Sequence, residues 1–184
     1  MTTASVESPV ATNVLAQDTV SEHANFAGEE HLVIFYLGDE QYGLDIAQVW
    51  EINEVHQITR VPRTPHFIEG VINLRGQITP VIDLRKRLNL PFKEHGRETR
   101  IIVVQVNDTR LGIVVDGVRE VIKVPGNMIE PPSQLVATVN STYIRGIAKL
   151  EDRLVILFDL ERLLTEDEGT TLNDIKETSA AAIA

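Results

Sequence analysis

The 184-residue sequence contains no cysteine, and this absence excludes disulfides, thiolate nucleophiles and cysteine-based metal sites. It contains no apolar run long enough to cross a bilayer, and its N-terminus lacks the basic and then apolar pattern of a secretion signal. We therefore expect a cytoplasmic protein with no direct membrane insertion.

Basic residues are also scarce, because 17 Lys and Arg stand against 27 Asp and Glu, for a formal net charge of −10. The excess acid lies at the two ends: residues 1–30 contain five acidic residues and no Lys or Arg, and residues 165–184 contain five acidic residues and one lysine. The body between them is left nearly neutral. Nucleic-acid binding needs a basic surface that neutralises phosphates, so we expect no nucleic-acid partner.

Familiar catalytic motifs are missing as well. There is no P-loop, no G-x-G-x-x-G dinucleotide fingerprint and no G-x-S-x-G nucleophile elbow. The five histidines show no i+2 or i+4 pairing that would suggest a metal site: His23, His31, His56, His66 and His95. We expect no catalytic activity, no cofactor and no metal.

The stretch at residues 70–90 carries the clearest local pattern. Residues 71–74 predict a strand, Arg75 and Gly76 a tight turn, and residues 78–82 a returning strand. Asp83 then predicts a helix start, because its carboxylate can accept bonds from the first free backbone N–H groups.

The same pattern recurs at residues 146–164, with 13 residues from glycine to aspartate in both copies. Positions alike in the two copies indicate framework: Leu74 and Leu150, Asp83 and Asp159, Leu84 and Leu160. Positions that differ are candidates for function: Asn73, Arg75, Gly76 and Pro80, replaced by Lys149, Glu151, Asp152 and Ile156. Arg75 stands out because Glu151 reverses its charge. The alternative is drift at an exposed turn.

The preceding segments repeat too, since Gly43 to Val49 and Gly112 to Val118 have equal spacing. The chain therefore predicts a mainly β fold of two small five-stranded barrels packed side by side, with short helices after Asp83 and Asp159. A single large sandwich is the alternative. The expected organisation is a mobile N-terminal tail (1–30), a domain (31–164) and a C-terminal tail (165–184). Within the domain we expect one subdomain at about 31–90, a linker at 91–99 and a second subdomain at about 100–164.

Four segments of the chain resemble the chemotaxis coupling (adaptor) protein family, CheW. The motif G-V-I-N-L-R-G-Q-I-T-P-V-I-D-L-R at residues 70–85 carries most of the likeness, with further matches at 37–46, 112–118 and 143–146. The resemblance covers about 31–164. It implies two SH3-like barrels around a shared apolar core and a scaffold protein without catalytic activity.

In this family the implied partners are the tip of a methyl-accepting chemoreceptor hairpin and the regulatory domain of the chemotaxis histidine kinase. The implied location is the inner face of the membrane, within receptor arrays. The same fold serving another receptor–kinase pathway, such as pilus-driven or gliding motility, is the alternative.

The resemblance places receptor contact at Val49 and Glu51, with Gly70 and Arg75 nearby. We expect Ile46, Val49 and Val118 to line a groove between the barrels, and Arg75 to pair with Glu51. Plain core packing is the other interpretation of Val49 and Val118, and framework is the other interpretation of Glu51, because Glu120 matches it.

Two further contacts are expected. By resemblance, the kinase docks barrel on barrel, and the second barrel makes an array contact near Leu135 and Glu130; the acidic Glu130 stands where relatives often carry a basic residue. Trp50 corresponds to Arg119 in the second copy, so we expect it to be partly exposed and available for contact. Core packing is the alternative for Trp50.

Overall fold

The computed structural model describes residues 28–132 and 142–183. The first half of the chain holds β1 (Glu29–Leu37), β2 (Glu40–Asp45), η1 (Ile46–Gln48), β3 (Val49–Glu54), β4 (Ile68–Leu74), β5 (Gln77–Asp83) and α1 (Leu84–Arg87). The second holds β6 (Arg100–Val106), β7 (Thr109–Val115), β8 (Gly117–Pro125), η2 (Gly126–Met128), β9 (Ile129–Glu130), β10 (Ile144–Lys149), β11 (Leu154–Phe158) and α2 (Glu166–Ile183).

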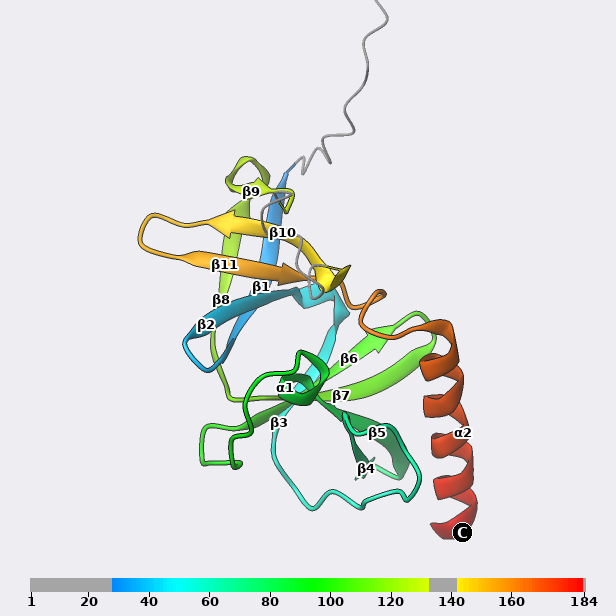
Figure 1. Ribbon diagram of the computed structural model, residues 1–184. Helices are drawn as coiled ribbons and strands as arrows, with labels where there is room; N and C mark the ends of the chain where they lie inside the picture. Colours follow the sequence, from blue (N-terminus) through cyan, green and yellow to red (C-terminus); the bar gives the residue numbers. More distant parts are fainter. Residues whose placement is uncertain (1–27, 133–141, 184) are drawn as a thin grey trace, which may run out of the picture.

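These strands form two sheets, which lie one above the other in Figure 1. The upper sheet has six strands in the order β8-β1-β2-β11-β10-β9, and the lower has five in the order β3-β6-β7-β5-β4. The mainly β fold of two barrel-like units is therefore confirmed.

Each sheet, however, takes strands from both halves of the sequence. Hairpin β1–β2 joins the upper sheet beside β8 and β11, while hairpin β6–β7 joins the lower sheet between β3 and β5. The expected division into subdomains at about 31–90 and 100–164 is thus wrong as a description of the sheets. Local patterning identifies strands but carries no information on which distant strand supplies the partner.

The internal duplication survives this exchange. By the sequence repeat, the lower-sheet strands β3, β6, β7, β5 and β4 correspond to β8, β1, β2, β11 and β10. The strand order of the lower sheet is therefore the same as that of the upper sheet, apart from the short β9. The parallel pairs also correspond, because Gly43 lies opposite Leu157 and Gly112 lies opposite Val81. The two halves therefore interlock as a pseudo-symmetric pair.

Three apolar clusters follow from this arrangement. The largest contains residues from both sheets, including Phe35, Ile82 and Phe158, and it is the shared core between them. A second cluster fills the upper sheet around Leu32, Ile34, Val155 and Leu157. A third fills the lower sheet around Ile72, Val81, Ile101, Val103 and Val114.

The two helices expected after Asp83 and Asp159 have different outcomes. Asp83 caps α1 as expected, accepting from the backbone N–H groups of Arg85 and Lys86. After Asp159, residues 160–164 form turns and no helix. The helix begins later because Thr165 and Glu168 form a capping box: Thr165 N donates to the Glu168 carboxylate (2.8 Å) and Glu168 N donates to the Thr165 hydroxyl (3.3 Å).

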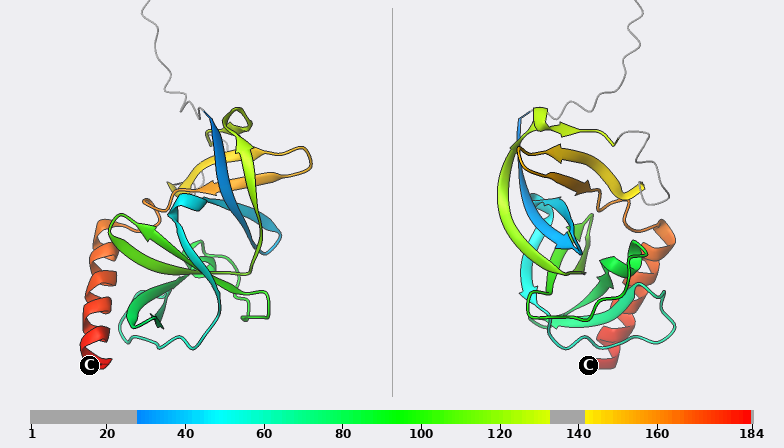
Figure 2. Two further views of the ribbon diagram at one scale, coloured as in Figure 1. Left: turned by 180° about the vertical axis from the view of Figure 1, so that it is seen from behind. Right: turned by 60° about the vertical axis from the view of Figure 1, so that its left-hand side comes forward.

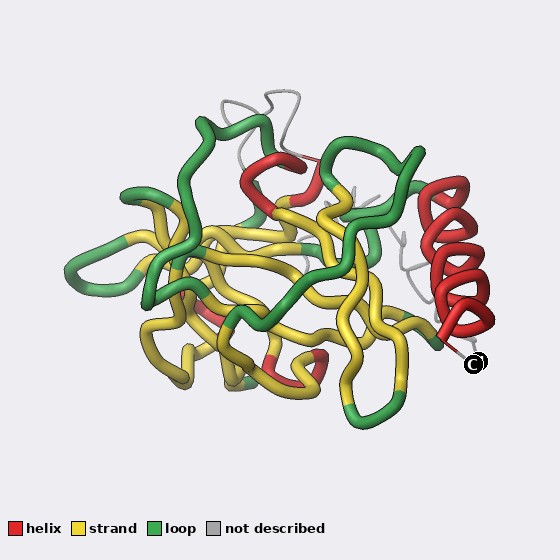
Figure 3. The backbone as a smooth tube through the Cα atoms, turned by 90° about the horizontal axis from the view of Figure 1, so that it is seen from below, coloured by secondary structure: helices red, strands yellow, loops and turns green. Residues whose placement is uncertain are grey.

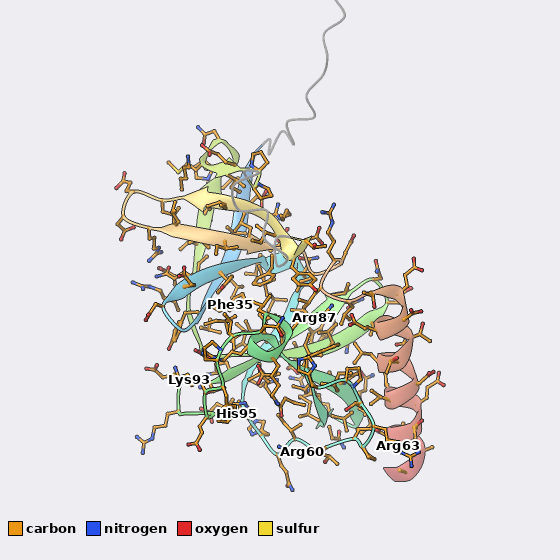
Figure 4. All side chains as sticks on the ribbon, in the orientation of Figure 1. Phe35, Arg60, Arg63, Arg87, Lys93 and His95 are labelled. Atoms are coloured by element: carbon orange, nitrogen blue, oxygen red, sulfur yellow. The ribbon has the colours of Figure 1, made fainter. Side chains whose placement is uncertain are left out.

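The segment expected as a C-terminal tail is therefore the helix α2, which lies along the lower sheet (Figures 1 and 2). From below it stands at one edge of the molecule (Figure 3). Leu172 and Ile175 of this helix are buried in the shared core. Arg87, labelled between the sheets in Figure 4, binds Glu168 through two hydrogen bonds and the carbonyl of Leu163 through a third.

No helix within the described ranges is long and apolar enough to cross a membrane. Residues 1–27 of the expected N-terminal tail lie outside the described part of the chain.

Candidate protein-binding surface

The turn that carries Arg75 is strained at that residue. Arg75 and Gly76 both have positive φ, 51° and 85°, as a two-residue hairpin turn between antiparallel strands requires. Asn73 supports the turn, because its Oδ1 accepts a bond from the backbone N–H of Gly76 (2.8 Å). Positive φ favours Gly, Asn or Asp, so an arginine at the first turn position carries a conformational cost.

Arg75 reaches from this turn to the neighbouring strand β3. Its guanidinium binds a carboxylate oxygen of Glu51 at 2.9 Å, which confirms the expected pairing. The Arg75 side chain is 80% exposed, whereas that of Glu51 is only 17% exposed. In this ion pair the Arg75 guanidinium is therefore accessible to solvent, and the Glu51 carboxylate that binds it is mostly buried.

Trp50 lies beside this pair on a β-bulge. Val49 pairs with Val104 and Glu51 with Val103, so Trp50 is the extra residue that the bulge inserts. Trp50 is 52% exposed, which confirms the expected exposure and excludes core packing. The guanidinium of Arg110, from β7, lies 3.6 Å from the ring centroid.

These side chains surround a shallow pocket of about 160 Å³ on the lower sheet. Its polar lining comes from Trp50, Glu51, Arg75, Gln77, Thr79 and Arg110. The residues belong to β3, β5, β7 and the β4–β5 turn, so the sheet itself sets their spacing. Sequence comparison of the two halves identifies Arg75 and Trp50, whereas Arg110 and Gln77 carry no local signal.

The other expected receptor contacts lie elsewhere or serve packing. Ile46 is 40% exposed on η1, and Val49 and Val118 are half-buried against the shared core. None of these three belongs to the described lining of the pocket. The structure therefore brings together Glu51, Arg75 and Trp50, and gives Val49 and Val118 a packing role.

Gly70 has a structural reason to be glycine. Its φ is +146°, and a Cβ there would lie 2.1 Å from the carbonyl oxygen of Thr59, whose backbone is hydrogen-bonded to Val71. Any side chain would push this loop away from β4. Gly70 thus allows the loop that carries Thr59 to lie against β4.

The expected array contact is only partly described. Glu130 is exposed at the end of β9 and binds Lys149 at 2.8 Å, whereas Leu135 lies outside the described residues. The face that would dock on a kinase remains a prediction.

Two of the ionisable groups with a shifted pKa serve structural roles. Burial raises the pKa of Asp83, whose carboxylate caps α1, and the hydrogen bond to Glu30 raises the pKa of Arg145. Across residues 28–132 and 142–183, no three acidic or histidine side chains gather in a metal-binding group. A surface pocket of paired side chains suits recognition of another protein.

Comparison with known proteins agrees with this picture. The CheW-like domain matches residues 31–168. The chain is 38% identical to the chemotaxis protein CheW of Klebsiella aerogenes over 160 residues, 87% of this chain and 96% of that protein. It is 40% identical to the chemotaxis protein CheW of Bacillus subtilis over 140 residues, 76% of this chain and 90% of that one.

A solved structure is also similar. The scaffolding protein TtCheW of Thermoanaerobacter tengcongensis superposes with a TM-score of 0.69 at 44% identity, covering 73% of this chain and 91% of that chain. Sequence and structure therefore place the chain in the family of CheW-like domain proteins.

Proposed function

We propose that this chain is a non-enzymatic chemotaxis adaptor that couples methyl-accepting chemoreceptors to the chemotaxis histidine kinase by binding both. Membership of the family supports a scaffold role, and relatives named as chemotaxis proteins support this pathway over pilus or gliding motility. The adaptor would work in the cytoplasm, at the inner face of the membrane, through the receptors that it binds.

One observation carries the receptor half of the proposal. Arg75 occupies a backbone conformation that disfavours arginine, yet its cation is mostly exposed and held by Glu51. The fold does not require arginine there, because the corresponding hairpin of the other half has Glu151. A residue kept at a conformational cost and presented to solvent is a candidate for contact with a partner.

The receptor contact would centre on Arg75 and Glu51, with Ile46, Val49 and Val118 along the seam of the sheets. Gly70 would act indirectly by holding the loop beside β4. A receptor hairpin tip presents helices, and helices dock by placing side chains into surface pockets and grooves.

The kinase contact would use a different face. The regulatory domain of the kinase is expected to dock barrel on barrel, and the region of Glu130 and Leu135 would add an array contact. Two separate faces allow both partners to bind at once, as an adaptor requires.

The test is charge reversal at Arg75. Arg75→Glu places two carboxylates together at Glu51, so binding to a receptor hairpin should fall at least tenfold while kinase binding and the melting temperature stay close to wild type. The matched control is Glu151→Arg, a reversal at the equivalent exposed turn, which should leave receptor binding unchanged. Equal receptor binding by Arg75→Glu and wild type would contradict the proposal.

A further inference from the structure

We propose that the pocket between Trp50 and Arg75 binds an acidic side chain of the receptor tip, and that Trp50 and Arg110 determine this specificity. The inference rests on the proposed function and names the chemistry that the receptor surface would select.

The first support is the local charge. The pocket holds two guanidinium groups, those of Arg75 and Arg110, against the single carboxylate of Glu51. Glu51 is already paired with Arg75, and within the described ranges no carboxylate pairs with Arg110. In a chain of net charge −10, this pocket is a local surplus of positive charge that a carboxylate would neutralise.

The second support is the orientation of Arg110. Its guanidinium stacks on the Trp50 ring at 3.6 Å, and its Nη1 donates to Oε1 of Gln77 at 3.2 Å. Stacking uses the face of the guanidinium and leaves its edge, which carries the N–H donors, for an acceptor. Contacts on both sides hold the group in place, so less side-chain freedom is lost when a carboxylate binds.

The third support is the equivalent position in the upper sheet. There Arg119 replaces Trp50, Gln41 replaces Arg110 and Glu151 replaces Arg75. The carboxylate that corresponds to Glu51 is that of Glu120, and it is bound by Arg153, which directly precedes β11, at 2.5 Å and by Arg119 at 3.5 Å. The stacked pair is therefore not a requirement of the fold, and the lower sheet places beside an aromatic ring a guanidinium that pairs with no carboxylate of the described residues.

Both the carboxylate and the methylene groups of a glutamate side chain fit this pocket. Its carboxylate would accept from the edge of Arg110, and its methylene groups would cover part of the exposed Trp50 ring. An amide in the same place keeps the size and loses the charge, so glutamate-to-glutamine changes in the partner isolate the ionic contribution.

The experiment measures binding of the full chain to a soluble chemoreceptor hairpin fragment whose tip acids are replaced one at a time by the corresponding amides. We expect Arg110→Gln to weaken binding about tenfold or more. One receptor variant should weaken wild-type binding similarly, yet cause little further loss against Arg110→Gln, because both changes remove the same contact. Arg110→Lys should recover part of the loss, and Arg119→Gln is the control that should change nothing.

The outcomes separate the two proposals. If wild type binds the hairpin and Arg110→Gln binds equally well, or no tip acid couples to Arg110, the acidic-side-chain proposal is wrong and the adaptor function stands. If wild type binds no hairpin fragment, the adaptor function fails and this inference fails with it. Should Arg110→Gln not fold, Trp50→Phe and Arg110→Lys decide the question through the same coupling to one tip acid.

Discussion

At the scale of single residues, the most informative contrast is between positions that the backbone requires and positions that it does not. Gly70 is required, because its φ of +146° and the nearby Thr59 carbonyl leave no room for a Cβ. Arg75 is not required, because its conformation would suit glycine or asparagine better. Gly70 and Arg75 are close in sequence, but substitutions at the two should have different consequences.

Gly70→Ala should therefore act on stability. The added methyl group meets the Thr59 backbone, so we expect the free energy of unfolding to fall by at least about 2 kcal/mol. Gly76→Ala is the control, because φ is also positive there but nothing lies within 4 Å of the added Cβ. That variant should lose only about 1 kcal/mol. Urea unfolding measures both, and equal losses would refute the steric explanation.

Comparison of the two halves of the sequence predicts some residues of the site and misses others. Trp50 and Arg75 stand out because Arg119 and Glu151 replace them, and the structure places both at one pocket. The comparison does not identify Arg110, because the role of Arg110 depends on β3 and β7 lying in one sheet with β6 between them. Stacking across strands is a tertiary feature that local sequence does not encode.

At the scale of elements, the hairpin at β4–β5 and the cap at Asp83 are predictable because turn and cap chemistry are local. The helix α2 is harder to predict. Its acidic composition resembles a solvated tail, and among its residues of described burial the buried ones are Leu172 and Ile175. Thr165 and Glu168 contain the missed signal, a capping box three residues apart.

Loss of the buried face of α2 should destabilise the domain. Leu172→Ala removes a side chain with no exposed surface, so we expect a loss of about 3 kcal/mol in the free energy of unfolding. The exposed neighbour Asp174 provides the control, and Asp174→Ala should change stability by less than about 0.5 kcal/mol. Thermal unfolding followed by circular dichroism tests this. A melting curve of Leu172→Ala that matches wild type would show that α2 adds little to the fold.

At the scale of the whole molecule, the exchange of hairpins makes the two halves depend on each other. Strand β1 pairs with β8 along most of its length, and β3 pairs with β6. Neither half can complete a sheet alone, and each would leave unpaired strand edges and exposed core residues. The duplication in the sequence therefore does not mark two independent folding units.

Separate fragments test this directly. Residues 1–95 and 96–184 are divided within an exposed loop, and each alone should lack the dispersed amide NMR spectrum of a folded protein. Mixed in equal amounts, they should recover that spectrum. A folded fragment of residues 1–95 would show that the first half forms a barrel without the second.

As the proposed adaptor, one molecule of this chain would hold a chemoreceptor and the kinase at the same time on separate faces. The most direct measurement is energy transfer between a labelled receptor hairpin and a labelled kinase regulatory domain as the chain is added. We predict a signal that requires the chain, rises to a maximum near equal concentrations and is lost with Arg75→Glu. A receptor hairpin that displaces the kinase domain, or a signal that Arg75→Glu leaves intact, would show that the chain does not bridge the two proteins through this surface.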